Sequence, residues 1–590
     1  MFGIETFVPP QPSDERQALA LTGATSIVGG NYLNWLASYG ITPKNLTERS
    51  DIVIDIADMG VDYGCGEANL PQSHKDVKGR IVYNNGSTND QPGGNYQWTD
   101  SQGHGTIVAG IAAGNPLAGL NASGQPLAID SAGVRSDGNN MKDTDAYGQF
   151  YYGLGIAPGA RIGNTKIMNS IQVGSPGDWT TRAVTRRCNT PGAPCSATGP
   201  LCPALVQNYS NNYYTPTGDL AGLYTSVARE LDISVRNADR ATMVPLSVTV
   251  AAGNIGQDGN DPTSQFLPGG TAKNVITMGA AESFRQNIPA CSGIKYTAGG
   301  FTVVSSISRR GTVDNRIKPD LLAPATLAFG PRYAAGGTYC GTAGISTMEG
   351  FPQYHGSSGT SFAAPVAAGA IALLRHFYTR NFGINPSPAL YKAMLIAGAR
   401  SITGGYDRYT SSTIPTWPSA QQGFGLLTVD PLFTSTNARA WREQTTPLQQ
   451  SQSVFYTVTV TNPLQPVKIV VVWTDLEGTI QDPTTIAPRA LKNDLDVTAT
   501  LPDGKRFYGN YVSSTAPGYS QSPGGCGRPV CPSPADTRNN VEVIHVDPAL
   551  FGNTANRTFS LRVIAANMAS VNGVPASQDF ALFVINGQLQ

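Results

Sequence analysis

A serine, a histidine and an aspartate are the residues best suited to chemistry, and the serine is the clearest of them. Ser361 lies in the stretch 359–365 (Gly-Thr-Ser-Phe-Ala-Ala-Pro) and is followed by small residues and good helix formers. This pattern predicts a loop that enters a buried helix. A hydroxyl there sits where unpaired N–H groups and the helix dipole favour developing negative charge, so it could attack a carbonyl group if a base were near. For an isolated Thr360 or Ser361, a simple helix cap is the alternative.

A histidine and an aspartate are the candidates for the base and its partner. His104 stands between Gly103 and Gly105 and precedes a run of small apolar residues, so we expect it in the first turn of a buried helix. Asp58 follows the β-branched run 52–57, which predicts a buried strand. Open α/β sheets place their working groups at such strand ends. A packed structural histidine and a turn-forming aspartate are the alternatives for each residue alone.

An asparagine could supply the group that such a serine site needs. Asn254 follows Ala252 and Gly253 at the end of a predicted strand, 244–250. Its side-chain amide could bind an oxyanion, although an Asx turn is the simpler interpretation.

The elements that must hold these residues alternate between strands and helices. Strand-like runs at 244–250 and 275–280 and a helical spacing over 220–239 predict a mostly parallel α/β sheet. Two polar, glycine-rich or cysteine-bearing stretches, about 115–154 and 174–203, are interpreted as insertions. The catalytic domain would then cover residues 1–447.

The remaining residues, 448–590, read as short strands separated by Asn, Asp, Gly and Pro turns, which suggests an all-β sandwich of the jelly-roll kind. Asp475, Asp494 and Asp496 in this region could supply oxygen ligands to calcium. Turn residues at strand ends are an equally good interpretation of these aspartates.

The composition of the chain limits the compartment in which the protein can act and the partners that it can bind. The chain of 590 residues is too long for one ordinary domain, and 40 basic residues balance 40 acidic ones. This balance gives no sign of nucleic-acid or anionic-membrane binding, and the sequence has no run of about 20 apolar residues that would predict a membrane span.

Eight cysteines, without nearby histidines, favour disulfides and a secreted protein over a zinc site. The first residues lack the features of a signal peptide, so secretion would require a signal and pro-segment removed before this numbering begins.

Taken in order, several blocks resemble those of the subtilisin-like serine proteases (subtilases), over about residues 52–430. They are Asp58-Met59-Gly60, His104-Gly105-Thr106, Ala252-Gly253-Asn254, 308–311, 317–324, Gly359 to Pro365 and 422–425. The segment after residue 448 is similar to the C-terminal sandwich of some secreted bacterial subtilases.

The resemblance implies a role for each candidate. Ser361 would be the nucleophile, His104 the general base and acid, and Asp58 the group that orients the imidazole. Asn254 would bind the oxyanion. The segment Ser210-Asn211-Asn212, together with Ala252 and Gly253, would pair with the substrate backbone as an added strand. Asn212 stands where the family usually has glycine, which adds bulk beside the side-chain pocket.

The sequence therefore predicts a secreted endopeptidase that acts on protein or peptide substrates as a monomer. It would need no cofactor for its chemistry, and a structural calcium ion is an additional expectation. Three alternatives remain open: a catalytically inactive subtilase used for binding, an acid-acting carboxyl peptidase of the sedolisin type, and an intracellular protease.

Overall fold

The computed structural model describes most of the chain, and the account below is confined to that part. The described residues are 31–64, 74, 76–85, 99–100, 103–115, 153–167, 175–187, 200–210, 221–255, 269–283, 300–326, 328–331, 354–434, 438–485, 488–513, 518–522, 535–571 and 573–590. Of the predicted insertion at 115–154, residues 116–152 lie outside these ranges.

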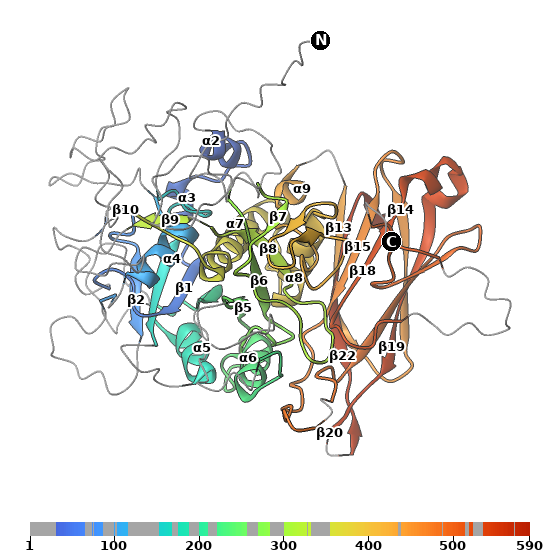
Figure 1. The fold of residues 1–590 in the computed structure, drawn as a ribbon. Coiled ribbons are helices and arrows are strands. Elements are labelled where there is room, and N and C mark those ends of the chain that lie inside the picture. The colour runs from blue at the N-terminus through green and yellow to red at the C-terminus, as the bar shows by residue number, and fades with distance from the viewer. Residues whose placement is uncertain are drawn as a thin grey trace, which may run out of the picture.

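A ten-stranded sheet forms the centre of the first part of the molecule (Figure 1). Its order is β12-β11-β7-β6-β5-β4-β1-β3-β2, and β8 pairs with β6 beside this path. The strands are β1 (Val53–Asp58), β2 (Ile81–Asn85), β3 (Arg161–Lys166), β4 (Val206–Tyr209), β5 (Ser247–Ala251), β6 (Ile276–Ala281), β7 (Val303–Val304), β8 (Leu321–Pro324), β11 (Tyr406–Asp407) and β12 (Ser412–Thr413). Neighbours from β2 through β6 pair in parallel, which confirms the predicted α/β fold with a mostly parallel sheet.

Helices cover both faces of this sheet because its central strands are apolar on both sides. In β1, Ile54 and Ile56 point into a core shared with α4 (His104–Ala113), α7 (Ala364–Phe382) and α8 (Pro388–Gly398). Ala57, which has the opposite orientation, joins a second core with α5 (Pro176–Thr185) and α6 (Ser226–Asn237). The remaining elements of this part are α2 (Asn31–Ser38), α3 (Pro43–Glu48), α9 (Asp430–Phe433), β9 (Ala328–Pro331), β10 (Tyr354–Ser357) and the 3-10 turn η1 (Thr360–Phe362).

One stretch that was interpreted as an insertion contributes to the core. Helix α5 lies within 174–203, and its Trp179, Ala183 and Val184 pack with α6. The Pro, Gly and Thr residues around it hid this helix from the sequence pattern.

Antiparallel sheets make up the C-terminal part, as Figure 1 shows on the right. One sheet has the order β13-β22-β15-β18 and the other β17-β16-β19-β14-β23, with a small hairpin, β20-β21. The strands are β13 (Arg439–Leu448), β14 (Ser453–Val460), β15 (Val467–Val472), β16 (Asp494–Thr500), β17 (Arg506–Tyr508), β18 (Val541–Val546), β19 (Thr558–Asn567), β20 (Ser570–Val571), β21 (Val574–Pro575), β22 (Gln578–Ile585) and β23 (Gly587–Leu589), with 3-10 turns η2 (Pro548–Gly552) and η3 (Thr554–Arg557). Strand β13, which spans the predicted domain boundary at 447/448, pairs with β22.

Three strands of the first sheet, β15, β18 and β22, are buried on both faces. On β22, Phe580, Leu582 and Val584 point into the interior between the two sheets, whereas Phe583 and Ile585 belong to the core that contains α8. The ten-stranded sheet and the C-terminal sheets are therefore joined through a continuous apolar core rather than through a flexible linker.

Candidate active site

Asp58 lies at the carboxyl end of the central strand β1, where the predicted site should be. Its carboxylate is fully buried and accepts the N–H of Met59 at 2.8 Å. Its two oxygens lie 2.9 and 3.0 Å from Nδ1 of His104. The structure thus brings together two residues that are 46 positions apart in the chain.

Two glycines and an aspartate hold His104 in place at the first position of α4. Gly103 has a φ of 86°, a backbone conformation that favours glycine. A Cβ at Gly105 would lie 2.0 Å from the carbonyl oxygen of Gly60, so only glycine lets α4 approach the end of β1 this closely. Asp100 accepts the N–H groups of Gly103 at 2.8 Å and Thr106 at 2.7 Å. Sequence reasoning did not select Asp100, although an acidic residue just before a helix is a usual N-terminal signal.

The environment of His104 favours its charged form. Burial alone would lower the pKa of the imidazole, but the adjacent Asp58 carboxylate offsets burial and raises the pKa of His104 above its usual value. Asp58 also fixes the tautomer: an Nδ1–H that donates to the carboxylate leaves Nε2 unprotonated, so Nε2 is the nitrogen that can act as a base.

Ser361 lies in η1, immediately before α7, as the sequence predicted. It is 8% exposed, and the ring of its neighbour Phe362 lies 5.6 Å from the ring of His104. The Ser361 hydroxyl donates to the carbonyl oxygen of Ser210 at 2.9 Å. A hydroxyl has only one hydrogen. The Ser361 hydroxyl must therefore break its hydrogen bond to the Ser210 carbonyl before it can donate to His104.

A buried chain of hydrogen bonds connects the sheet to Ser361. Thr249 on β5 donates to Oδ1 of Asn208 on β4 at 3.0 Å, and Nδ2 of Asn208 donates to Oγ of Ser210 at 2.8 Å. The Ser210 hydroxyl in turn donates to the carbonyl oxygen of Ser361 at 2.7 Å. We call Thr249, Asn208 and Ser210 the positioning chain. Only Ser210 was a predicted site residue, because the partner of Asn208 on β5 is 41 positions away and leaves no local signal in the sequence.

Asn254 faces the same loop from the end of β5. Its Oδ1 accepts the N–H of Thr360 at 2.8 Å and the Thr360 hydroxyl at 3.0 Å. The Thr360 hydroxyl also accepts the N–H of Gly253 at 3.0 Å. An amide nitrogen can only donate, so Nδ2 is the group of Asn254 that suits an oxyanion, and it lies beside Gly359, where a Cβ would be 3.2 Å away. Thr360 was considered only as a cap, and its pairing with Asn254 could not be read from the sequence.

The other predicted substrate-binding residues are only partly described. Ala252 and Gly253 lie between β5 and Asn254, and the N–H of Ala252 donates to the carbonyl oxygen of Met278 at 2.9 Å. Asn211 and Asn212 lie outside the described residues.

The three candidate calcium ligands have different surroundings. The buried Asp475 accepts the N–H groups of Lys492 and Asn493, each at 2.8 Å, and lies 3.6 Å from Nζ of Lys273, so it already has cationic and N–H partners. Asp494 and Asp496 each have one buried oxygen without a hydrogen-bond partner. Within the described ranges, no group of three or more His, Cys, Asp or Glu side chains is arranged to hold a metal ion. The calcium site therefore stays a prediction.

Two further expectations concern the setting of the protein. Seven of the eight cysteines lie outside the described residues, and the eighth, Cys202, is buried. The disulfide framework therefore stays a prediction. The part of the chain that the structure describes contains no helix long and apolar enough to cross a membrane.

Comparison with known proteins identifies the family. The model of the subtilase family (Peptidase_S8) matches residues 49–425, more than half of the chain, so this protein belongs to the subtilase family of serine proteases. The predicted family resemblance is confirmed.

Individual relatives match over shorter stretches. The chain is 27% identical over 285 residues to the serine protease/ABC transporter B family protein tagA of Dictyostelium discoideum, which covers 44% of this chain and 14% of that protein. It is 36% identical over 143 residues to the serine protease AprX of Bacillus subtilis (strain 168), covering 24% of this chain and 29% of AprX. The chain therefore matches less than a third of the length of either relative.

Solved structures with similar chains are also proteases. They include the S41 psychrophilic protease, with 19% identity, a TM-score of 0.38 and coverage of 72% of this chain and 100% of that one. The patellamide maturation protease PatA has 18% identity, a TM-score of 0.37 and coverage of 65% and 96%.

Proposed function

We propose that this protein is a serine endopeptidase that uses Asp58, His104 and Ser361 as its catalytic triad. The observation that carries the proposal is the buried Asp58–His104 pair, 2.9 Å apart, beside the loop that holds Ser361. A carboxylate that raises the pKa of a buried imidazole, next to a serine at a helix start, is an arrangement suited to acyl transfer.

The reaction would begin with rotation of the Ser361 hydroxyl from the Ser210 carbonyl toward Nε2 of His104. The hydroxyl oxygen attacks the peptide carbonyl as His104 takes its proton, and Asp58 stabilises the resulting imidazolium. The Nδ2 group of Asn254 and the N–H of Ser361 bind the oxyanion, and one such donor contributes about 3 kcal/mol to transition-state stabilisation. His104 then protonates the leaving amine, and water releases the acyl group by the same steps in reverse.

Substrate binding can trigger that rotation. An extended substrate that pairs with residues 210–212 as an added strand would present an N–H to the Ser210 carbonyl. The substrate N–H would then replace the Ser361 hydroxyl as the donor, which frees the hydroxyl for His104.

The decisive experiment compares wild-type protein with Ser361→Ala. Wild type is expected to cleave casein and to be labelled by a fluorophosphonate, whereas Ser361→Ala should lose at least about 10⁴-fold in kcat/KM and all labelling. An unchanged melting temperature of the variant would show that folding is intact. Equal casein cleavage by both proteins would exclude Ser361 as the nucleophile, and a wild type that neither cleaves nor labels would revive the inactive-subtilase alternative.

We also propose that the protein acts outside the cell on proteins or peptides, as a monomer, with disulfides among its eight cysteines. The eight cysteines, none of them in a Cys-x-x-Cys spacing, support this setting. The C-terminal antiparallel sheets are proposed to form one jelly-roll-like domain, and a structural calcium ion would have to draw Asp494 and Asp496 together. Free-thiol titration before and after reduction tests the disulfides, and a calcium-dependent melting temperature tests the ion.

A further inference from the structure

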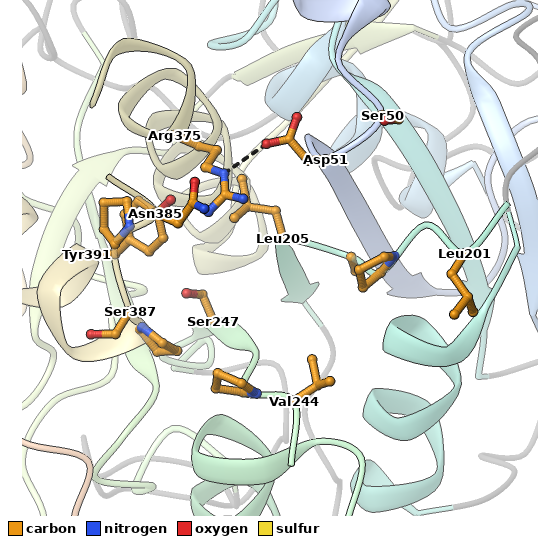
Figure 2. A pocket seen from close by; sticks show the side chains of 15 residues that line it. Ser50, Asp51, Leu201, Leu205, Val244, Ser247, Arg375, Asn385, Ser387 and Tyr391 are labelled. Carbon is orange, nitrogen blue, oxygen red and sulfur yellow. Dashed lines mark hydrogen bonds and ion pairs between the residues drawn. The ribbon is translucent and has the colours of Figure 1, made fainter. Parts of the chain in front are cut away.

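A pocket lies at the end of the sheet opposite the candidate active site. Figure 2 shows the side chains that line it. It is about 400 Å³ in volume, within the range of ligand-binding pockets. Its walls come from the residues before β1, β4 and β5, from α7, and from the loop that leads into α8. Because the strands are parallel, Asp51 before β1 marks their amino ends, whereas Asp58 marks their carboxyl ends.

One wall of this pocket carries the guanidinium group of Arg375 beside the carboxylate of Asp51. Asp51 accepts Nε of Arg375 at 3.0 Å and two nitrogens of Arg49, each at 2.6 Å. Burial would raise the pKa of Asp51, but these two guanidinium groups lower it to about 2, so the carboxylate stays ionised. Of the two, only Arg375 lines the pocket, and Glu443 accepts the N–H of Ser387 on another wall at 2.8 Å. Asp51 binds Arg375 through Nε, so the terminal nitrogens beside Tyr391 form the fork that suits a carboxylate.

A buried hydroxyl lies on the same wall. Tyr391 on α8 is 1% exposed, and no group among the described residues accepts the hydrogen of its hydroxyl. Arg375 is close enough to interact with this hydroxyl, and it can only donate. An oxygen ligand beside both side chains would accept the hydrogen of the Tyr391 hydroxyl and bind the Arg375 guanidinium group.

The other walls restrict what can accompany that oxygen ligand. They are mainly proline and aliphatic: Pro203, Leu205, Val244, Pro245, Pro386 and Pro388. Apolar side chains fit such walls, and the single guanidinium fork of Arg375 suits a monovalent carboxylate.

We propose that this pocket binds the C-terminal carboxylate of a peptide whose last residues are small and apolar. Arg375 and Tyr391 hold the carboxylate, and the proline walls hold the side chains. The proposal is independent of the catalytic assignment, because no residue of the triad lines the pocket.

The test uses the full-length Ser361→Ala protein and three probes measured by isothermal titration calorimetry. N-acetyl-Pro-Leu carries a free carboxylate, its C-terminal amide lacks one, and N-acetyl-Pro-Asp-amide carries the charge on a side chain. We expect N-acetyl-Pro-Leu to bind at least tenfold more tightly than both of the others. Equal binding of the amide, equal binding of the aspartyl probe, or no binding of N-acetyl-Pro-Leu would each overturn the proposal.

Two variants locate the binding. Arg375→Gln should weaken binding of N-acetyl-Pro-Leu at least tenfold, while Arg49 still neutralises Asp51. Tyr391→Phe removes only the unsatisfied hydroxyl, so it should weaken binding severalfold without lowering the melting temperature. Undiminished binding in both variants would place the ligand elsewhere. Binding that disappears from wild-type protein labelled by a fluorophosphonate would assign the ligand to the cleft around Ser361 instead.

Discussion

At the scale of single residues, the Asp58–His104 pair sets the pH at which the protein can act. A protonated His104 cannot accept the serine proton, and Asp58 raises the pKa of His104. The acidic limb of kcat/KM is therefore expected above the ordinary histidine pKa of about 6.5, with activity rising as pH increases through it. Asp58→Asn should move this limb to lower pH and reduce kcat about 10⁴-fold. A pH profile with an activated ester substrate would measure both effects, and an unmoved limb would contradict the assignment of Asp58.

The positioning chain makes a second prediction at this scale. Asn208→Asp replaces the amide that donates to Ser210, so the Ser210 hydroxyl would turn toward the new carboxylate and leave the Ser361 carbonyl. Misplacing a reacting group by about 1 Å can cost on the order of 10²-fold, so kcat and the fluorophosphonate labelling rate should fall by up to that factor with little change in KM.

Thr249→Val provides the matched control, because it removes only the far end of the same chain. It should lower kcat by no more than about threefold, as expected for one buried neutral hydrogen bond. A purely structural role of Asn208 would instead lower the melting temperature of Asn208→Asp and leave the labelling rate of the folded fraction unchanged.

Much of the candidate site could be anticipated from residue type and local spacing. Ser361, His104 and Asp58 each stand at the boundary of a strongly patterned segment, and that boundary is visible in the sequence. Thr360 and Asn208 could not be recognised, because their importance comes from partners about 106 and 41 positions away. Hydrogen bonds across the fold leave no periodic signal in the chain.

At the scale of elements, the position of the first turn of α4 determines the His104–Asp58 contact. Gly105→Ala would place a methyl group 2.0 Å from the carbonyl oxygen of Gly60. A backbone atom cannot rotate out of the way as the end of a side chain could. Helix α4 must then shift from the end of β1 and lengthen the His104–Asp58 contact. We expect a loss of about 1–3 kcal/mol in stability and at least a tenfold loss in kcat. Gly383→Ala, at the end of α7 where nothing lies within 4 Å, is the control: it should affect stability through its φ of 68° but leave kcat unchanged.

The strands of the C-terminal part were predicted better than their environment. Residues 448–590 were predicted to form short strands, and β14 to β23 all lie there. Strands β15 and β22 are nearly continuous apolar runs, which indicate strands buried on both faces. This signal was visible in the sequence but was not used, and α8 is the layer that covers the second face.

At the scale of the whole molecule, the shared core predicts that the two parts unfold together. Phe583 on β22 is fully buried in the core that contains α8, and its ring lies 6.4 Å from the ring of Tyr378 on α7. The adjacent Leu582 points the other way, into the core between the C-terminal sheets. Phe583→Ala should lower the free energy of unfolding by about 3–5 kcal/mol and Leu582→Ala by about 2–5 kcal/mol.

Because the ten-stranded sheet and the C-terminal sheets share one core, each variant should show a single calorimetric transition at a lowered temperature, and protease activity should be lost at that same temperature. Leu582→Ala is the stricter test, since its side chain is remote from α8. Activity that persists after the C-terminal sheets of Leu582→Ala have melted would mean that the sandwich unfolds independently and that the apolar contact with α8 does not couple them.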